Sequence, residues 1–254
     1  MLGILQRLTV PRKRNEGMTL ESNVLLGQEM TEGTAAFELS REKRDRESAE
    51  EELRITIEKL RKIAGATIDA MARAVEVRDP YTAGHQKRVS VLAWEVASFL
   101  GLSADQMDGI KMAGHIHDIG KISLPQEILS KPGALTDIEF SLIKGHPEVG
   151  FNILKDVEFP WDIAQIVLQH HERLNGTGYP QGLSGERILL EAKILAVADV
   201  VEAMASHRPY RPALGLDKAV DEILSKKGLL YDPCVVDACL SVLEKWSSEN
   251  KGRW

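Results

Sequence analysis

The 254-residue sequence has little cysteine, no excess of basic residues and no long apolar run. Its two cysteines, Cys234 and Cys239, cannot crosslink a domain of this size, which favours a reducing compartment. No run of about 18 apolar residues occurs, so we expect no membrane span. At the N-terminus the apolar stretch precedes the basic residues, the reverse of a signal peptide. The net charge of −6 argues against a broad nucleic-acid footprint but allows a small anionic ligand. We therefore expect a cytoplasmic protein that does not bind nucleic acid.

The sequence also lacks the alternation of apolar and polar residues that is typical of strands, and it has no internal repeat. Beyond Pro80, apolar residues recur at spacings of three and four. Thr136 followed by Glu139 is a capping-box signature for a helix start. The pattern predicts an all-α fold with helices over residues 83–100, 105–117, 136–155, 160–171, 191–206, 216–225 and 233–245.

The N-terminal third divides at about residue 40. Residues 1–39 show little periodicity, and we interpret them as a partly ordered lead. Residues 40–77 contain no proline and are dense in helix formers. Within them, apolar residues follow steps of four and three, interrupted at Thr67: Leu53, Ile57, Leu60, Ala64 and Met71. This spacing predicts one long helix, which either packs on its own domain or forms a parallel dimeric coiled coil.

Histidine and aspartate are grouped in a way that suggests metal binding. The pairs His117-Asp118 and His170-His171 lie in separate predicted helices. Neutral imidazole and carboxylate are ligands for zinc, iron or manganese. His115 and His117 differ by about 200° around a helix, so His115 is better interpreted as a core residue or as one that supports a ligand without binding the metal. We predict a hydrolase that uses metal ions.

Five segments in this order resemble the HD-GYP family: RDPYTAGHQKRV, GHIHDIGKI, KGHPEVG, QHHERLNGTGYPQGLSGE and AKILAVADVVEAMASHRPYR. This family is a branch of the HD-domain metal phosphohydrolases whose members hydrolyse cyclic dinucleotides, chiefly cyclic di-GMP. The resemblance implies a helical bundle of the HD-domain type over residues 67–247. An isolated HD pair is a weak signal, but HD followed by HHE and a GYP loop is a specific one.

The resemblance implies seven metal ligands: His85, His117, Asp118, His146, His170, His171 and Asp199. Asp118 would bridge two ions, one held by His85, His117 and Asp199 and the other by His146, His170 and His171. The family implies iron or manganese. A subset of the family holds a third ion through a glutamate at the position of Tyr81 here, so we expect two ions.

Four further residues match substrate-handling positions of the family. Lys121 would stabilise charge on the phosphate, although a lysine there can also complement a helix dipole. Arg208 and Arg211 would grip the substrate, unless they lie in a solvated turn. Tyr179 would line the substrate mouth or meet a partner protein, or the GYP loop simply shapes a turn.

The chain departs from the family pattern at positions that are not metal ligands. Lys193 stands for arginine, Leu189 for proline, Glu202 for aspartate and His207 for an acidic residue. Changes around metal ligands tune affinity and turnover, so these put rate and substrate preference in doubt.

The leading hypothesis is a phosphodiesterase that converts cyclic di-GMP to pGpG or onward to GMP. The alternatives are an HD-type phosphohydrolase acting on another nucleotide and a catalytically weak module that binds cyclic di-GMP. The segment FELSREKRDRESAEEEL is similar to the helix that follows PAS sensor domains. Residues 40–77 would then form a homodimer and report the state of a sensor or diguanylate cyclase partner.

Overall fold

The computed structural model describes residues 17–78, 84–131, 133–206 and 214–249. The chain divides into two compact units, Met1–Lys62 and Ile63–Trp254. No strand occurs in these ranges, where β-structure is limited to two isolated bridges. The predicted all-α fold is confirmed. None of the described helices is both long and apolar enough to cross a membrane.

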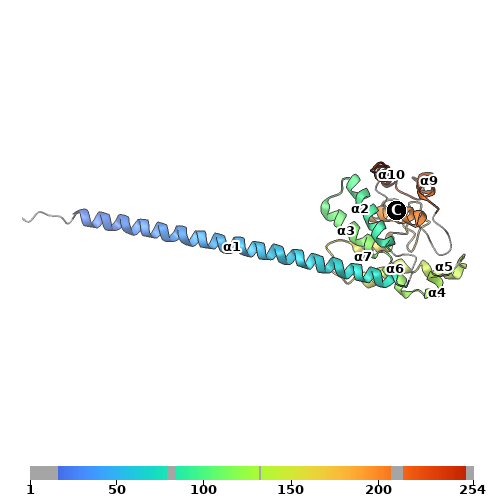
Figure 1. The fold of residues 1–254 in the computed structure, drawn as a ribbon, viewed down its shortest axis with the longest axis horizontal. Helices are drawn as coiled ribbons and strands as arrows, with labels where there is room; N and C mark the ends of the chain where they lie inside the picture. The colour runs from blue at the N-terminus through green and yellow to red at the C-terminus, as the bar shows by residue number, and fades with distance from the viewer. Residues whose placement is uncertain (1–16, 79–83, 132, 207–213, 250–254) are drawn as a thin grey trace, which may run out of the picture. The chain divides into compact units, whose positions relative to one another are not determined.

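Helix α1 is continuous from Gly17 to Glu76 (Figure 1). The sequence pattern predicted that this helix would start at residue 40, so the helix is longer at its N-terminal end than expected. Leucine, methionine, glutamate and alanine dominate its first turns, and their helix propensity outweighs Gly27 and Gly33, which cost about 1 kcal/mol each. In the first unit, exposed pairs such as Arg46–Glu50 (2.7 Å) support the helix. In the second unit, its last turns bury Ile68, Ala72 and Val75.

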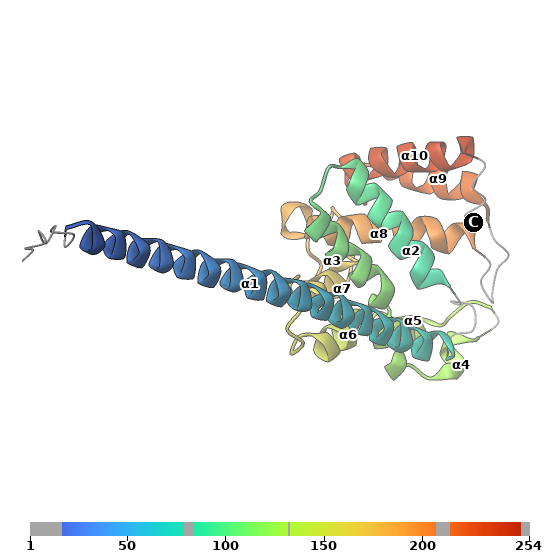
Figure 2. The same cartoon turned by 60° about the vertical axis from the view of Figure 1, so that its left-hand side comes forward.

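The second unit continues with helices α2 to α10 (Figure 2), and its described residues also include the 3₁₀ turns η2 and η3. Their bounds are α2 His85–Phe99, α3 Ala104–Ile116, η2 Ile119–Ser123, α4 Gln126–Leu129, α5 Asp137–Ile143, α6 His146–Leu154, α7 Ile163–Gln169, η3 Gly185–Arg187, α8 Leu190–Ala205, α9 Leu216–Ser225 and α10 Pro233–Ser248.

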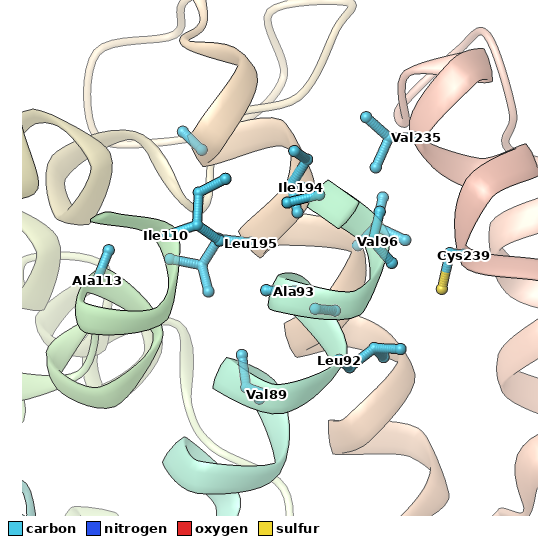
Figure 3. Packing of buried hydrophobic residues seen from close by; sticks show 14 of the residues in the cluster. Val89, Leu92, Ala93, Val96, Ile110, Ala113, Ile194, Leu195, Val235 and Cys239 are labelled. Carbon is cyan, nitrogen blue, oxygen red and sulfur yellow. The ribbon is translucent and has the colours of Figure 1, made fainter. Parts of the chain in front are cut away.

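Helix α2 lies at the centre of the core. Its residues Val89, Leu92, Ala93 and Val96 are fully buried. They meet α3 through Ile110 and Ala113, α8 through Ile194 and Leu195, and α10 through Val235 and Cys239 (Figure 3). Each large buried side chain contributes about 1.5–3 kcal/mol. Both cysteines are free thiols, and burial raises the pKa of Cys239 to about 12, so it acts as an apolar core residue.

The predicted helix over residues 136–155 is two helices, α5 and α6, separated at Lys144–Gly145. The capping box at its start is present, because Thr136 Oγ1 accepts the Glu139 N–H (3.3 Å) and Glu139 Oε2 accepts the Thr136 N–H (2.7 Å). The break is explained by Pro147 in the first turn of α6, since proline has no N–H for the preceding turn.

Gly120 is the position where η2 and α6 touch backbone to backbone. A Cβ atom there would lie 1.9 Å from the His146 carbonyl oxygen and 2.6 Å from the Gly150 nitrogen. Only glycine fits without moving one of the two elements. This contact sets the distance between the segments that carry Asp118 and His146.

We expect Gly120→Ala to lower the free energy of unfolding by about 1–3 kcal/mol, because the added methyl group forces η2 and α6 apart. Urea denaturation of the metal-free protein measures the change. The matched control is Gly65→Ala in α1, where a Cβ atom would have no neighbour within 4 Å. That variant should gain about 0.5–1 kcal/mol. A Gly120→Ala protein as stable as wild type would contradict the close approach.

Candidate metal centre

The seven predicted ligands are brought together from the ends of several helices. They lie at the start of α2, just after α3, at the start of α6, just after α7 and in the middle of α8: His85, His117, Asp118, His146, His170, His171 and Asp199. His171 is half-buried and the other six are buried. Six of the seven side chains lie at or next to helix termini, and Asp199 alone projects from the body of a helix.

Three groups of these residues are spaced closely enough to hold a metal ion, with ligand atoms within 4.8 Å of one another in each group. The groups are His85, His117 and Asp199; His146, His170 and His171; and His117, Asp118 and His170. The first two groups are the sets that the sequence assigned to separate ions, and the third connects them.

Asp118 lies between the two histidine groups, and its two oxygens face different sides. Oδ1 is 3.3 Å from His146 Nε2. Oδ2 is 3.4 Å from His117 Nε2 and 3.9 Å from His85 Nε2. A carboxylate in this position can give one oxygen to each of two cations. On the far side, Asp199 Oδ1 is 3.2 Å from His85 Nε2.

Three imidazoles are oriented by a backbone carbonyl three residues earlier in the chain. The Nδ1–H of each ring donates to that oxygen: His117 to Gly114 (2.9 Å), His146 to Ile143 (2.7 Å) and His170 to Val167 (2.6 Å). The residue after His146 is Pro147, which has no N–H of its own to share this carbonyl. These bonds assign the proton to Nδ1 and leave the Nε2 lone pairs for the centre.

His85 is oriented by a carboxylate instead. Its Nδ1 pairs with Glu202, which also accepts hydrogen bonds from Arg88 Nε (2.7 Å) and the Ser206 hydroxyl (2.6 Å). Burial opposes charge on Glu202, but the hydrogen bond and charge of His85 outweigh it and lower the pKa to about 2. The sequence marked Glu202 only as a departure from the family. Its spacing of three residues from Asp199 on one helix face could have indicated this contact.

Burial keeps most of the imidazoles neutral. It lowers the pKa of His170 to about 3 and lowers the pKa values of His117 and His171. Burial also opposes charge on Asp118, but the Lys121 ammonium and neighbouring imidazoles outweigh it and hold its pKa well below the usual value. Neutral imidazole and ionised carboxylate are the forms that bind a metal.

His117 provides the clearest sign that a cation fits this centre. Its Nε2 atom is buried and has no hydrogen-bond partner. An unsatisfied buried acceptor costs about 1–3 kcal/mol, which a cation would offset. Together with two ionised carboxylates and the neutral imidazoles around it, this atom makes the residues suitable for divalent metal ions.

The GYP loop folds back onto the two consecutive histidines. The Tyr179 ring lies 4.7 Å from the His171 ring at an interplanar angle of 31°, and the Tyr179 N–H donates to the His171 carbonyl (3.2 Å). A Cβ on Gly178 would lie 2.4 Å from Glu172 Cα, so the loop requires glycine there. Tyr179 thus lies beside the centre, and burial raises its pKa.

Glu172 fixes this loop, and sequence reasoning did not single it out. Its buried carboxylate accepts the Gln181 N–H at Oε1 (2.7 Å) and the Leu183 N–H at Oε2 (2.9 Å). The signal was present, because Glu172 is the third residue of the HHE motif. These two hydrogen bonds hold the loop against the histidines.

Lys121 and His115 lie on different sides of the segment that carries His117 and Asp118 in the sequence, and only Lys121 contacts Asp118. Lys121 Nζ is 2.6 Å from Asp118 Oδ2, which places its ammonium at the edge of the centre. His115 points elsewhere and pairs with Asp69 of α1 (3.1 Å).

The remaining sequence predictions concern positions outside the seven ligands. Lys193 Nζ lies 3.4 Å from Asp232 Oδ2. The Leu189 N–H donates to Gln169 Oε1 (2.8 Å). The predictions for Tyr81, His207, Arg208 and Arg211 fall outside the described residues.

A family model described as HD domain matches residues 69–235. The chain belongs to the HD-domain family. Its HD pair, HHE motif and GYP loop place it in the HD-GYP branch, as the sequence resemblance indicated.

Curated relatives support this membership. The chain is 39% identical over 240 residues to the cyclic di-GMP phosphodiesterase response regulator RpfG of Xanthomonas campestris, covering 94% of this chain and 61% of that protein. It is 45% identical over 172 residues to a cyclic di-GMP phosphodiesterase of Thermotoga maritima, covering 67% of this chain and 46% of that protein. A 3'3'-cGAMP-specific phosphodiesterase 3 of Vibrio cholerae is 34% identical over 178 residues, covering 70% and 38%. The chain therefore spans less than two thirds of each relative.

Solved structures show the same HD-domain fold. Bd1817, an HD-GYP protein of Bdellovibrio bacteriovorus, aligns with a TM-score of 0.54 at 20% identity, covering 63% of this chain and 51% of that one. The cyclic GMP-AMP phosphodiesterase V-cGAP3 of V. cholerae aligns with a TM-score of 0.54 at 16% identity, covering 73% and 51%.

We expect the metal-free protein to lose stability as the pH falls from about 7 to about 5. His170 has a folded pKa of about 3 against 6.5 for the free side chain, so the unfolded chain binds its proton first. Below pH 6.5, this difference between the folded and unfolded pKa lowers the free energy of unfolding by up to about 1.4 kcal/mol for each pH unit. His117 and His171 act in the same direction. His85 acts oppositely, since the carboxylates of Asp199 and Glu202 outweigh its burial and raise its pKa.

Urea denaturation at a series of pH values measures this dependence. The contribution of Glu202, whose folded pKa is about 2, is lost only as the pH falls below about 4.5. The control is His170→Gln, which should show a shallower dependence above pH 5 than wild type. Stability that stays constant between about pH 7 and pH 5 would mean that the imidazoles are not held neutral.

Proposed function

We propose that the chain is a metal-dependent phosphodiesterase that hydrolyses cyclic di-GMP to pGpG, with GMP as the product of a second hydrolysis. The observation that carries this proposal is the position of Asp118, whose two oxygens face separate histidine groups. Four curated relatives named as cyclic di-GMP phosphodiesterases, at 38–45% identity, support the choice of substrate.

The proposed centre holds two divalent ions, iron or manganese. His85, His117 and Asp199 would hold one ion, His146, His170 and His171 would hold the other, and Asp118 would contribute to both. Nitrogen and oxygen donors without thiolate suit these metals. When bound, such ions acidify a water molecule and neutralise the phosphodiester charge.

Side chains around the centre bind the substrate and stabilise the negative charge on its phosphate. Lys121, with its ammonium at Asp118, stabilises negative charge that grows on the phosphate during attack. Arg208 and Arg211 bind phosphate or guanine through their planar guanidinium groups. Tyr179 lines the substrate mouth beside His171. Glu172 keeps the Tyr179 loop in place.

A second substrate is favoured by a specific observation. Three V. cholerae relatives at 33–36% identity are named 3'3'-cGAMP-specific phosphodiesterases. The two substrates differ in one base, so both reactions would use the same centre. Turnover of equal concentrations of cyclic di-GMP and 3'3'-cGAMP ranks them.

We expect Lys121→Met to keep its metal and to lower kcat for cyclic di-GMP by about 10²–10³, because the variant lacks only the charge at the phosphate. Asp118→Asn should lose both metal and turnover, because the amide is a poor bridging ligand. The measurements are product chromatography and elemental analysis of protein prepared anaerobically with iron or manganese. The matched control is Lys155→Ala, an exposed lysine at the end of α6.

Three outcomes of that experiment would contradict parts of the proposal. Wild-type protein that binds cyclic di-GMP without hydrolysing it would be a receptor module. Wild-type protein that hydrolyses another nucleotide and spares cyclic dinucleotides would be a different phosphohydrolase. Wild-type turnover by Lys121→Met would remove Lys121 from the catalytic residues.

We further propose that residues 40–77 form a parallel homodimer that transmits the state of a sensor or diguanylate cyclase partner. The catalytic domain would comprise residues 67–247, and α1 extends on the N-terminal side of the proposed dimer segment as far as Gly17. Leu53, Ile57 and Leu60 support the dimer, because they are spaced by four and three and are 59%, 43% and 61% exposed. Exposed apolar residues in such a row are buried by a second copy of the helix.

We expect Leu60→Glu to convert the dimer to a monomer, because it places a carboxylate in the proposed seam. Light scattering of the full chain after size-exclusion chromatography measures the mass. The matched control is Ile55→Glu, an exposed isoleucine that the same spacing places away from the seam. A dimer that persists in Leu60→Glu, or a wild-type chain that is monomeric, would overturn this assignment.

A further inference from the structure

The segment from Ile63 to Arg78, which contains the last turns of α1, contacts three of the segments that carry the metal centre. Its apolar residues Ile68, Ala72 and Val75 are buried in the core of the second unit. Its polar residues Asp69, Glu76 and Arg78 each bind a segment adjacent to a proposed ligand. We name residues 63–78 the input segment.

Arg78 holds the end of η2. Its Nη2 donates to the Leu124 carbonyl (2.9 Å), and its Nη1 donates to the Ile122 carbonyl. η2 starts directly after Asp118 and contains Lys121. The Lys121 N–H donates to the Asp118 carbonyl (2.9 Å), and the Leu124 N–H donates to the Lys121 carbonyl (3.0 Å). The guanidinium therefore fixes the turn that places the Lys121 ammonium on Asp118.

Glu76 holds the segment before His85. Its Oε1 accepts the Gly84 N–H (3.0 Å), and Gly84 is the residue before His85. Gly84 has a φ of 72°, so the chain turns sharply there. Asp69 makes a third contact, to His115, two residues before His117. The input segment thus contacts both sides of one proposed ion site.

We propose that Arg78 and Glu76 are positioning residues through which the input segment sets the geometry of the metal centre. This inference rests on the proposed function and adds a route by which α1 would regulate it. Arg78 acts on turnover through Lys121. Glu76 acts on metal affinity through His85. Glu76 ends α1, and Arg78 follows in a turn in which its N–H donates to the Val75 carbonyl (2.9 Å), so a shift of the input segment along the helix axis would move both contacts together.

Arg78→Lys tests the first contact, because lysine keeps the charge but lacks the planar fork that reaches two carbonyls. We expect kcat for cyclic di-GMP to fall by about 10-fold or more, since small misplacements of a catalytic group reduce rate strongly. KM and metal content should stay within about 2-fold of wild type, a split that a general loss of folding would not give. The matched control is Arg73→Lys, an exposed arginine in the last turn of α1, which should leave kcat unchanged.

A double-mutant cycle separates positioning from a purely structural role. If Arg78 acts through Lys121, Arg78→Lys should have no further effect on kcat in the Lys121→Met background. An equal loss in both backgrounds would overturn the proposed route, as would an unchanged kcat in Arg78→Lys alone.

The second contact is tested without any substrate. Glu76→Gln keeps a carbonyl oxygen for the Gly84 N–H, whereas Glu76→Ala removes it. We expect Glu76→Ala to weaken the binding of one ion by about 10-fold, as loss of a contact around a metal ligand does, and Glu76→Gln to retain the wild-type affinity. Titration of the metal-free full chain with cobalt(II), followed by visible absorption, measures both affinities.

The turnover measurements and the cobalt titration distinguish a failure of the proposed function from a failure of the positioning role. Wild-type protein without turnover would contradict the proposed function, while the cobalt titration would still report on the Glu76 contact. Equal cobalt affinity in wild type, Glu76→Ala and Glu76→Gln would overturn the positioning role of Glu76, whatever the turnover.

Discussion

The ionised carboxylate of Asp118, buried between two groups of imidazoles, is the constraint on which the rest of this structure depends. A buried charge is costly unless it is paired and hydrogen-bonded. Here Lys121 Nζ lies 2.6 Å away and three imidazole Nε2 atoms lie within 3.9 Å. The surrounding helices end or begin at this carboxylate because their termini must supply those partners. A cation held at this carboxylate would therefore also stabilise the fold of the domain.

Several sets of residues, at increasing distance from this carboxylate, hold the centre in place. The imidazoles are aimed by carbonyls and by Glu202, and the histidine pair is covered by a loop that Glu172 holds. Gly120 lets η2 and α6 approach closely enough for Asp118 to meet His146. Each set uses a different interaction, namely hydrogen bonding, charge and steric fit. A change in any set alters the centre without touching a ligand.

Sequence periodicity and motif spacing predicted the helical class, most helix bounds and the separation of His115 from the ligands. They did not predict the early start of α1, because its glycines suggested breaks that good helix formers outweigh. The break before His146 was not predicted, because the apolar spacing continues across it while Pro147 interrupts the backbone hydrogen bonds of the helix. The contacts of Glu172, Glu76 and Arg78 join residues to backbone groups well beyond one helical turn, and neither a motif nor a periodicity records such pairings. The seven-ligand assignment remains a prediction that the geometry supports.

The hydrogen bond from the His146 ring to the Ile143 carbonyl holds the proton of that ring on Nδ1. The same bond is made by His117 and His170, although the next residue is proline only after His146. The backbone three residues earlier therefore selects the tautomer of each ring, whatever residue follows the histidine. A substitution near one of these histidines that moves its carbonyl partner would release the ring proton to the other nitrogen and block the lone pair that faces Asp118.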